Sequence, residues 1–481
     1  MSEELGIKTK RSDDFSEWYL EVMDKCDIVD KRYPVKGFVV YKPWGMFVIN
    51  QIFDALEEEL QKTGHNPVSF PVLIPEGNLK KESEHVKSFE KEVFWITHAG
   101  ENKLDERLLL RPTSETAFYP MYSLWIRSHT DLPLKLYQCA QIYRYETKMT
   151  KPLLRGREFF WIEAHTVQKT NEDAEKQVKE DMAITEKVLS EKLGLPFMLL
   201  QRPEWDKFPG AEKTYAYDTI MPDGKTLQVA TTHNLGQKFS KPFHIKFANE
   251  KGDSEYAYQT CYGPGVSRIV GAVISVHGDD KGMILPPPVA PTQVIVIPIP
   301  IKGKEELVEK EAKNILKEIE KLGLRARIDS RGYRPGFKFH EWEMKGVPIR
   351  IEIGPKDIEK KQFIAVRRDT GEKIILKDAK KVGEMLDVIY KNLKETARKN
   401  FESRIRNAKS FQEISKNIEN GGLVGINFCS MEKDGEKCAE KIEKELHAEI
   451  RGAKLVKEKP TGNCVICGKP AKHVVYVAKA Y

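Results

Sequence analysis

One stretch of the chain, from Arg111 to Thr166, limits what the protein can be more than any other. It contains two segments rich in aromatic and β-branched residues, LYQCAQIYRYE and REFFWIEAHT, and the basic loop TKMTKPLLRGR joins them. This composition predicts two strands connected as a β-hairpin. The helix-like segment that follows RPTSET precedes the hairpin along the chain.

The second strand of this hairpin has two different faces, because side chains two residues apart share a face. The apolar face can be buried, and it carries Phe160, Ile162 and Ala164. The opposite face carries Trp161, Glu163 and His165. An aromatic ring, a carboxylate and an imidazole make a poor core, so this face is expected to form the wall of a pocket.

The first strand and the loop carry groups that suit phosphate chemistry. By the same alternation Arg144 and Glu146 are expected to point the same way. An arginine on a rigid strand can hold a phosphate with two hydrogen bonds. The loop adds further positive charge, from Lys148, Lys151, Arg155 and Arg157. A lone Arg-x-Glu is more often part of a solvated surface. The neighbouring motifs therefore decide whether this pair binds phosphate.

Length and composition describe a globular protein of several domains. A chain of 481 residues can form two or three domains, and it is 40% hydrophobic and 31% charged. It has no run of about 18 apolar residues, so we expect no membrane span. The first residues lack the apolar core of a secretory signal, which predicts a cytoplasmic location. The net charge of +7 is compatible with a polyanionic partner without requiring one.

The cysteines point to a metal site near the C-terminus. Seven cysteines, an odd number without a signal sequence, argue against a disulfide framework. Four of them are close together, at Cys429, Cys438, Cys464 and Cys467. The NCVICGKP segment is a good zinc half-site, whereas the spacing of the first pair is wider than usual. Four thiolates predict a structural zinc with no open position, and unliganded cysteines are the alternative.

Prolines mark the end of the first domain. Pro286, Pro287, Pro288 and Pro291 form a stiff boundary. Strands and helices alternate beyond it, which is typical of a small α/β domain. We therefore predict domains at residues 1–285, 286–395 and 396–481.

Five motifs in one order carry a family resemblance: RPTSET, YRYET, FFWIEAHT, LQVATTHNLG and CYGPGVSRIVGAVISVHGD. Together they resemble class II aminoacyl-tRNA synthetases, and specifically prolyl-tRNA synthetases of the archaeal and eukaryotic type, from about Phe15 to Tyr481. The resemblance implies an antiparallel-sheet catalytic core with flanking helices, a small α/β anticodon-binding domain and a C-terminal α/β zinc-binding domain. It also implies a homodimer, formed through a helix and strand that end near Pro75.

The same resemblance implies the reaction and the residues that perform it. L-proline would be activated with ATP and Mg²⁺ to prolyl-adenylate and transferred to the 3′ end of tRNA(Pro), with Arg144 and Arg268 as the catalytic residues. ATP would contact Arg144, Glu146, Arg155, Gln228, Thr231 and Arg268. Proline would contact Thr113, Glu115, Arg144, Trp161, Glu163, His165 and His233. The anticodon would contact Glu343, Arg350, Glu352, Lys356 and Asp357.

Two of these assignments have competing explanations in the residues themselves. On spacing alone, SETA after a proline is typical of a helix-capping box, which would give Glu115 a structural role. Strict alternation places Gln228 on the opposite strand face from Thr231 and His233. All three can line one site only if the backbone bulges near Ala230.

Other functions remain to be weighed against this one. A class II synthetase for threonine or glycine would share the ATP arginines but differ in its amino-acid pocket. A non-catalytic paralogue that binds tRNA or regulates would lose the ATP residues, whereas Arg144, Glu146 and Arg268 are all present. A basic RNA-binding protein would explain the charge but not the motifs.

Overall fold

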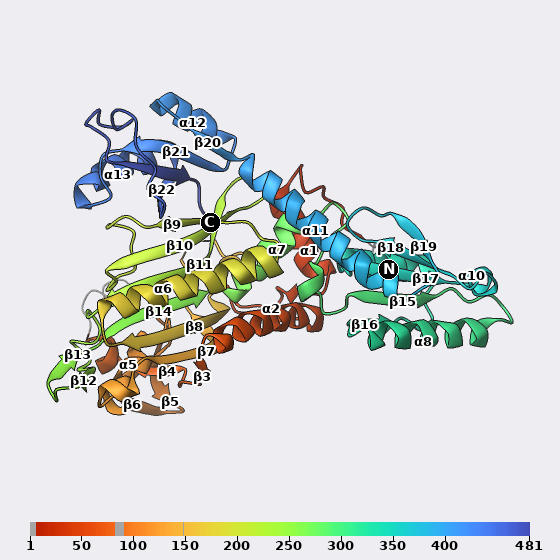
Figure 1. Cartoon of the computed structure of the whole chain (residues 1–481), viewed down its shortest axis with the longest axis horizontal. Helices are drawn as coiled ribbons and strands as arrows, with labels where there is room; N and C mark the ends of the chain where they lie inside the picture. Colours follow the sequence, from red (N-terminus) through yellow and green to blue (C-terminus); the bar gives the residue numbers. More distant parts are fainter. Residues whose placement is uncertain (1–5, 82–90, 148) are drawn as a thin grey trace.

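The computed structural model describes residues 6–81, 91–147 and 149–481. Its largest element is an eleven-stranded sheet with the strand order β20-β21-β23-β22-β9-β10-β11-β14-β8-β7-β3. Neighbouring strands are antiparallel, except that β3 is parallel to β7 and β20 is parallel to β21. The molecule is elongated, with a smaller α/β unit at the far end from this sheet (Figure 1).

The strands of the large sheet come from two distant parts of the chain. The first part supplies β3 (Asn66–Pro67), β7 (Leu134–Tyr143), β8 (Glu158–Gln168), β9 (Met198–Gln201), β10 (Lys213–Ile220), β11 (Thr226–Gly236) and β14 (Tyr258–Pro264). The second part supplies β20 (Ile405–Asn407), β21 (Leu423–Phe428), β22 (Glu449–Lys454) and β23 (His473–Ala478). We call residues 405–481 the C-terminal domain; its helices are α12 (Phe411–Glu419) and α13 (Glu436–Leu446).

One face of the large sheet is buried under helices. These are α2 (Pro43–Lys62), α6 (Asn171–Thr185), which continues as the π-helical η2 (Glu186–Lys192), and α7 (Val266–His277). The apolar side chains Ile162 and Ala164 of β8 belong to the core beneath them, and Phe160 packs against it. The predicted apolar face of β8 is therefore confirmed, and its opposite face is left for other contacts.

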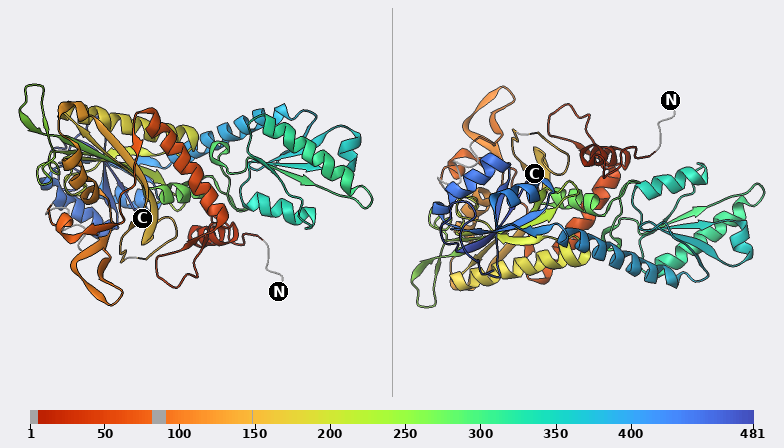
Figure 2. Two further views of the ribbon diagram at one scale, coloured as in Figure 1. Left: turned by 90° about the horizontal axis from the view of Figure 1, so that it is seen from below. Right: turned by 90° about the horizontal axis from the view of Figure 1, so that it is seen from above.

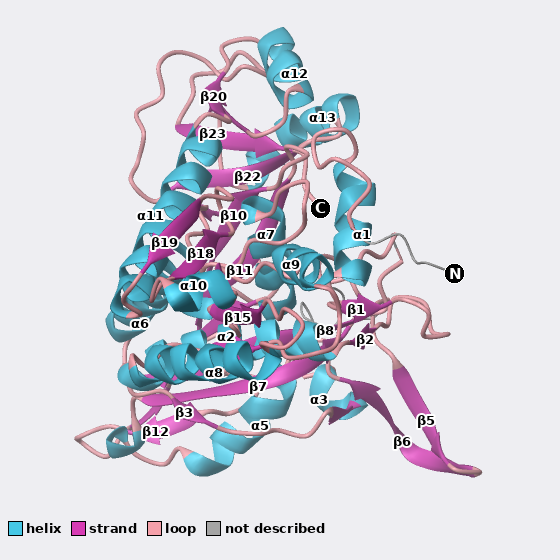
Figure 3. Ribbon diagram, turned by 90° about the vertical axis from the view of Figure 1, so that its right-hand side faces the viewer, coloured by secondary structure: helices cyan, strands magenta, loops and turns pink. Residues whose placement is uncertain are grey.

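Short elements surround this core. They are α1 (Phe15–Lys25), β1 (Val29–Asp30), β2 (Val40–Tyr41), β4 (Leu73–Pro75), α3 (Glu76–Leu79), β5 (Trp95–Ala99), β6 (Asn102–Leu110), α5 (Glu115–Trp125), η1 (His129–Asp131), β12 (Lys246–Ala248) and β13 (Ser254–Tyr256). The β5–β6 hairpin extends away from the body (Figure 3). Helix α5 starts at Glu115, at the edge of the sheet face that α7 does not cover.

The middle α/β unit has its own five-stranded sheet, in the order β16-β15-β17-β18-β19. Its elements are η3 (Pro287–Val289), β15 (Val294–Pro298), α8 (Glu305–Lys321), β16 (Ala326–Ile328), α9 (Pro335–Met344), β17 (Ile349–Ile353), α10 (Pro355–Glu359), β18 (Phe363–Arg367), β19 (Lys373–Leu376) and α11 (Lys380–Glu402). A separate hydrophobic core confirms the predicted α/β unit beyond the prolines. Helix α11 runs from this unit back toward the large sheet (Figure 2), and the predicted boundary after residue 395 falls inside it.

Candidate active site

A cavity of about 350 Å³ lies on the uncovered face of the large sheet. Eight residues predicted from the sequence line it: Thr113, Glu115, Arg144, Trp161, Glu163, Gln228, Thr231 and His233. We call it the polar cavity. The residues that line it range from Thr113 to Arg451, so the fold brings together segments that are far apart in the sequence.

The polar cavity depends on a bulge in β11. Tyr217 of β10 pairs with Ala230, whereas the next residue, Asp218, pairs with Gln228, so the pairing skips Val229. Val229 is buried in the core on the other side. The extra residue turns Gln228 onto the same face as Thr231 and His233, which is the bulge that the predicted site required.

The acceptor end of the cavity consists of a hydroxyl between two carboxylates. Thr113 Oγ1 lies 2.5 Å from Glu115 Oε2 and 2.9 Å from Glu163 Oε1. Glu163 Oε1 also accepts from the backbone N–H of Ser114 at 3.2 Å. The buried Glu163 Oε2 has no hydrogen-bond partner within residues 6–81, 91–147 and 149–481. A buried acceptor without a partner is costly, so this oxygen indicates where a ligand donor belongs.

The capping-box interpretation of this segment is wrong. Ser114 precedes α5, but its side chain makes no cap hydrogen bond. Its Oγ instead accepts from Gln138 Nε2 at 2.8 Å. Because the Ser114 hydroxyl is bound to Gln138 of β7, it does not cap the helix. Glu115 lines the cavity.

Arg144 occupies the cation end of the cavity. Its Nε donates to the backbone carbonyl of Pro112 at 2.9 Å, and its guanidinium carbon lies 5.6 Å from the ring centre of Phe159 and 5.7 Å from that of Trp161. Burial lowers the pKa of Arg144, but an arginine stays charged even so. A Cβ on Gly263 would come within 2.6 Å of Trp161, so only glycine lets the indole lie this close to β14.

The prediction that Arg144 and Glu146 share a strand face is wrong, because β7 ends at Tyr143. The backbone N–H of Arg144 donates to the carbonyl of Arg157, and that of Glu146 donates to the carbonyl of Arg144 at 2.7 Å. The chain therefore turns tightly here. Further along, the loop packs closely on α7, where a Cβ on Gly271 would come within 2.6 Å of Leu154.

The remaining predicted cations surround this loop. Arg155 donates to Glu146 Oε2 at 3.1 Å, and Arg268 donates to the backbone carbonyls of Leu154 and Gln228 at 3.0 and 3.1 Å. Burial, together with the charges of other arginines nearby, lowers the pKa of Arg268 to about 10. Mutually repelling cations held in one place attract an anion. Lys148 lies outside the described residues.

Two of the predicted histidines lie near the cavity: His233 lines it, whereas His165 is not among the described residues that do. His165 Nδ1 lies 3.1 Å from Tyr119 Oη, and its Nε2 is buried. His233 Nδ1 lies 2.9 Å from Thr214 Oγ1, and burial lowers the pKa of His233 to about 4. His233 is therefore neutral at pH 7. Cys261, which the sequence analysis missed, lies 3.5 Å through its Sγ from Glu115 Oε1.

The predicted anticodon residues lie in the middle unit, but they do not form one cluster. Glu343 and Arg350 line one small cavity. Glu352 is buried and accepts from Arg350 at 2.8 Å, whereas Asp357 accepts from the backbone N–H of Gly354 at 3.0 Å. Lys356 is exposed on α10.

The four predicted zinc ligands converge. The Sγ atoms of Cys429, Cys438, Cys464 and Cys467 lie within 4.8 Å of one another. The Cys429 and Cys438 sulfurs are 3.7 Å apart. A tetrahedral ZnS₄ centre with bonds of about 2.3 Å places its sulfurs about 3.8 Å apart, so this thiolate set fits zinc.

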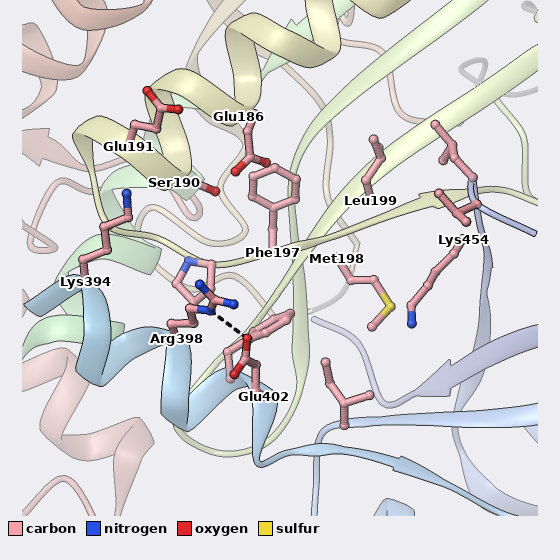
Figure 4. Close-up of a pocket in the computed structure, with 16 residues that line it drawn as sticks. Glu186, Ser190, Glu191, Phe197, Met198, Leu199, Lys394, Arg398, Glu402 and Lys454 are labelled. Atoms are coloured by element: carbon pink, nitrogen blue, oxygen red, sulfur yellow. Dashed lines mark hydrogen bonds and ion pairs between the residues drawn. The ribbon is translucent and has the colours of Figure 1, made fainter. Parts of the chain in front are cut away.

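A larger cavity, of about 750 Å³, lies elsewhere, between η2, β9, α11 and β22. We call it the apolar cavity, because Phe197, Met198, Leu199, Phe401 and Ile405 form its walls. Its charges lie at the rim, as in the 2.7 Å contact between Arg398 and Glu402 (Figure 4). It contains none of the residues predicted to bind a substrate.

The antiparallel sheet, with arginines from the hairpin loop and from the start of α7 meeting beside one cavity, defines a class II aminoacyl-tRNA synthetase. Family comparisons agree: residues 94–277 match the tRNA synthetase class II core domain (G, H, P, S and T), 293–392 the anticodon binding domain, and 411–481 the prolyl-tRNA synthetase C-terminal domain.

Comparison with whole proteins gives the family. The proline–tRNA ligase of Thermofilum pendens is 49% identical over 100% of both chains, and that of Methanocaldococcus jannaschii is 48% identical over 92% of this chain and 98% of its own. The Giardia lamblia prolyl-tRNA synthetase in complex with prolyl-adenylate superposes with a TM-score of 0.94 at 41% identity, covering 99% of this chain and 100% of its own. The chain belongs to the prolyl-tRNA synthetase family.

Proposed function

We propose that the polar cavity is where this proline–tRNA ligase activates L-proline with ATP, and where the prolyl group passes to the 3′ end of tRNA(Pro). The observation that carries the proposal is the buried Glu163 Oε2, which has no hydrogen-bond partner among the described residues, in a cavity that Glu115 and Arg144 also line. One end of the cavity is suited to an ammonium group and the other to phosphate. An amino acid and a nucleotide together supply those two charges.

Proline is placed with its ammonium group at the acceptor end. Thr113, Glu115 and Glu163 would receive the two N–H bonds of the secondary ammonium group. Trp161, His165 and His233 would surround the ring, and the proline carboxylate would lie toward Arg144. Because His233 stays neutral, it adds no charge that would repel the ammonium.

ATP is placed at the cation end, beside the hairpin loop. Arg144 would hold the α-phosphate, Glu146 the adenine edge, and Arg155 and Arg268 the outer phosphates. Gln228 and Thr231, which line the same cavity, would contact the nucleotide. Mg²⁺ takes phosphate oxygens readily, so we propose that it enters with ATP and neutralises charge on the outer phosphates.

The chemistry needs little covalent participation from the protein. A proline carboxylate oxygen attacks the α-phosphorus, the bond to the bridging oxygen breaks, and diphosphate leaves. A ribose hydroxyl of the tRNA then attacks the carbonyl carbon of prolyl-adenylate, and AMP leaves. The residues named above act by holding the reactants in line and by stabilising negative charge.

The middle unit is proposed to read the anticodon, through Glu343, Arg350, Glu352, Lys356 and Asp357. Loop bases expose their pairing edges, which carboxylates and cations can contact. Glu343 and Arg350, which line one small cavity, are the best placed to contact one base together. Glu352 already binds Arg350, and Asp357 binds the backbone N–H of Gly354 at the start of α10. These two carboxylates would therefore act by fixing the shape of the surface that contacts the bases.

The other parts of the proposal concern assembly. The four cysteines are proposed to hold a structural zinc, which would fold the C-terminal domain without taking part in catalysis. Cys464→Ser should lower the measured zinc content from about one ion per chain to near zero. We further propose a homodimer through α2 and the segment that ends with β4 at Pro75. We also propose a cytoplasmic location, and domains at 1–285, 286–395 and 396–481. Among the described helices, none combines the length and apolarity that crossing a membrane requires.

ATP–diphosphate exchange with each of the twenty amino acids tests the proposed function. Proline should stimulate exchange far more than any other amino acid. Stimulation by threonine or glycine instead would indicate a sister synthetase. No stimulation by any amino acid would indicate a non-catalytic paralogue.

A further inference from the structure

The C-terminal domain reaches the polar cavity through one side chain, Arg451. Strand β22 pairs with β9 of the catalytic sheet, with Ala453 opposite Gln201 and Lys454 opposite Leu200. The two sheets are therefore continuous, and β22 and β9 lie side by side in Figure 1. Nothing in the local sequence around Arg451 indicates this, because the domain begins more than a hundred residues beyond the last of the five motifs.

A second bulge aims Arg451 at the cavity. Ile450 pairs with Val477, and Gly452 pairs with the next residue of β23, Tyr476, so Arg451 is skipped. A bulge of this kind redirects a side chain. Gly452 has a φ of 124°, and a Cβ there would come within 2.2 Å of the Gln201 carbonyl oxygen. Only glycine allows this turn.

The guanidinium of Arg451 is bound to a buried carboxylate that it shares with a second arginine. Its Nε lies 2.8 Å from Asp218 Oδ2, and Arg202 lies 3.0 Å from Asp218 Oδ1. Arg202 also donates to the backbone carbonyl of Arg451. Burial alone would raise the pKa of Asp218, but the two arginines outweigh it and lower that pKa. The carboxylate is therefore charged at pH 7.

The arrangement ends at a residue proposed to bind ATP. One terminal nitrogen of Arg202 donates both to Asp218 and, at 2.7 Å, to Gln228 Oε1. Arg451 binds Asp218 Oδ2, so Arg202 does not have to satisfy both oxygens of that carboxylate. One N–H of Arg202 is therefore available to Gln228. Without Arg451, the carboxylate would have Arg202 as its one close cation among these residues and would draw it away from Gln228.

We infer that Arg451 is a positioning residue for the activation of proline, which it supports by fixing Gln228 through Asp218 and Arg202. The C-terminal domain would then contribute a side chain that positions an active-site residue, in addition to packing against the catalytic sheet. The inference rests on the proposed function of the polar cavity. Arg451 does not touch the reacting atoms, since its donors are directed to Asp218 and Glu449.

A matched control separates positioning from simple attachment of the domain. Arg404 also joins the C-terminal part of the chain to the catalytic sheet, by donating to the carbonyls of Met221 and Pro222 at 2.8 and 3.1 Å. It is not among the described residues that line the polar cavity. Arg404→Met therefore weakens the attachment and leaves Gln228 in place.

The test is ATP–diphosphate exchange with full-length wild type, Arg451→Met, Arg451→Lys and Arg404→Met, together with each variant's Tm. Arg451→Met should raise the KM for ATP about tenfold, the size expected for a lost hydrogen bond to a charged group. The KM for proline should stay within about twofold. Arg451→Lys, which keeps the charge but not the fork, should recover part of the loss. Arg404→Met should lower Tm and keep the wild-type KM for ATP.

A double-mutant cycle with Gln228→Ala makes the test specific. If Arg451 acts through Gln228, Arg451→Met should add little to the KM for ATP in the Gln228→Ala background. An equal effect in both backgrounds, or an equal effect of Arg404→Met, would overturn the inference. So would a wild-type KM for ATP in Arg451→Met or, should that variant not fold, in Arg451→Lys. A wild-type enzyme that exchanges without proline dependence would refute the proposed function itself.

Discussion

Of the two cavities, the smaller one holds the buried polar groups that chemistry needs, and the larger one does not. The apolar cavity has a volume of about 750 Å³ and the polar cavity about 350 Å³. Around the larger one, Arg398 and Glu402 satisfy each other at the exposed rim. In the smaller one, Glu163 keeps a buried oxygen without a partner among the described residues. The difference teaches that fixed polar groups held out of water identify a catalytic site better than size does.

The largest effect should come from Arg144, at the cation end of the polar cavity. Arg144→Ala should reduce kcat for ATP–diphosphate exchange by about 10²–10³ or more, because it removes charge placed where negative charge develops. Its Tm should stay close to that of the wild type. Full activity in this variant would contradict the central assignment.

The size of the polar cavity sets a limit on its selectivity. Alanine is smaller than proline and can enter a slot built for the ring, and a missing methylene is worth only about 1–3 kcal/mol. We therefore expect measurable exchange with alanine and cysteine, at kcat/KM values about 10–200-fold or somewhat more below that for proline. Rejection of both by more than about 10⁴ would show that polar contacts, rather than shape, exclude them.

Glu163 tests the acceptor end. Glu163→Gln removes the negative charge that would face the ammonium group, and it should raise the KM for proline about tenfold to a hundredfold. The KM for ATP should change much less. Glu402→Gln in the apolar cavity is the matched control, and it should leave both values unchanged. A similar rise for the two variants would remove the distinction between the cavities.

Much of this site was predictable from short-range pattern. Alternation along β8 gave the correct two faces for Ile162 and Glu163, and the same rule showed that Gln228 needs a bulge. Alternation failed at Arg144 and Glu146, because β7 ends at Tyr143 and the chain turns tightly just after it. The contact between Asp218 and Arg451 joins residues 233 positions apart. It follows from the joining of two sheets, which no local pattern encodes.

Two buried histidines, one near each cavity, should make the stability of the protein depend on pH. Burial lowers the pKa of His233, in the polar cavity, and of His277 to about 4. His277 lies beside the apolar cavity, where its Cε1 would be 3.5 Å from a Cβ on Gly194. Between about pH 6.5 and 4 the unfolded chain binds more protons than the folded one. Stability should therefore be complete above pH 6.5 and fall as the pH decreases through this range.

Replacing either histidine with glutamine should reduce the loss of Tm between pH 7.5 and pH 5, since one group that resists protonation is gone. Only His233→Gln should also raise the KM for proline at pH 7.5. The His277 Nε2, 2.9 Å from the Leu193 carbonyl, serves the fold alone. A change in the KM for proline in His277→Gln would show that the two cavities communicate.

The smallest effect should come from Arg398, at the rim of the apolar cavity. Its side chain is 73% exposed, and its partner Glu402 lies one helical turn away on α11. Such pairs are screened by water and contribute little. Arg398→Ala should therefore keep kcat and both KM values within about twofold of the wild type. A larger loss of exchange would mean that the apolar cavity, which Lys454 of β22 also lines, is coupled to Arg451 on the same strand, and that it belongs to the active site.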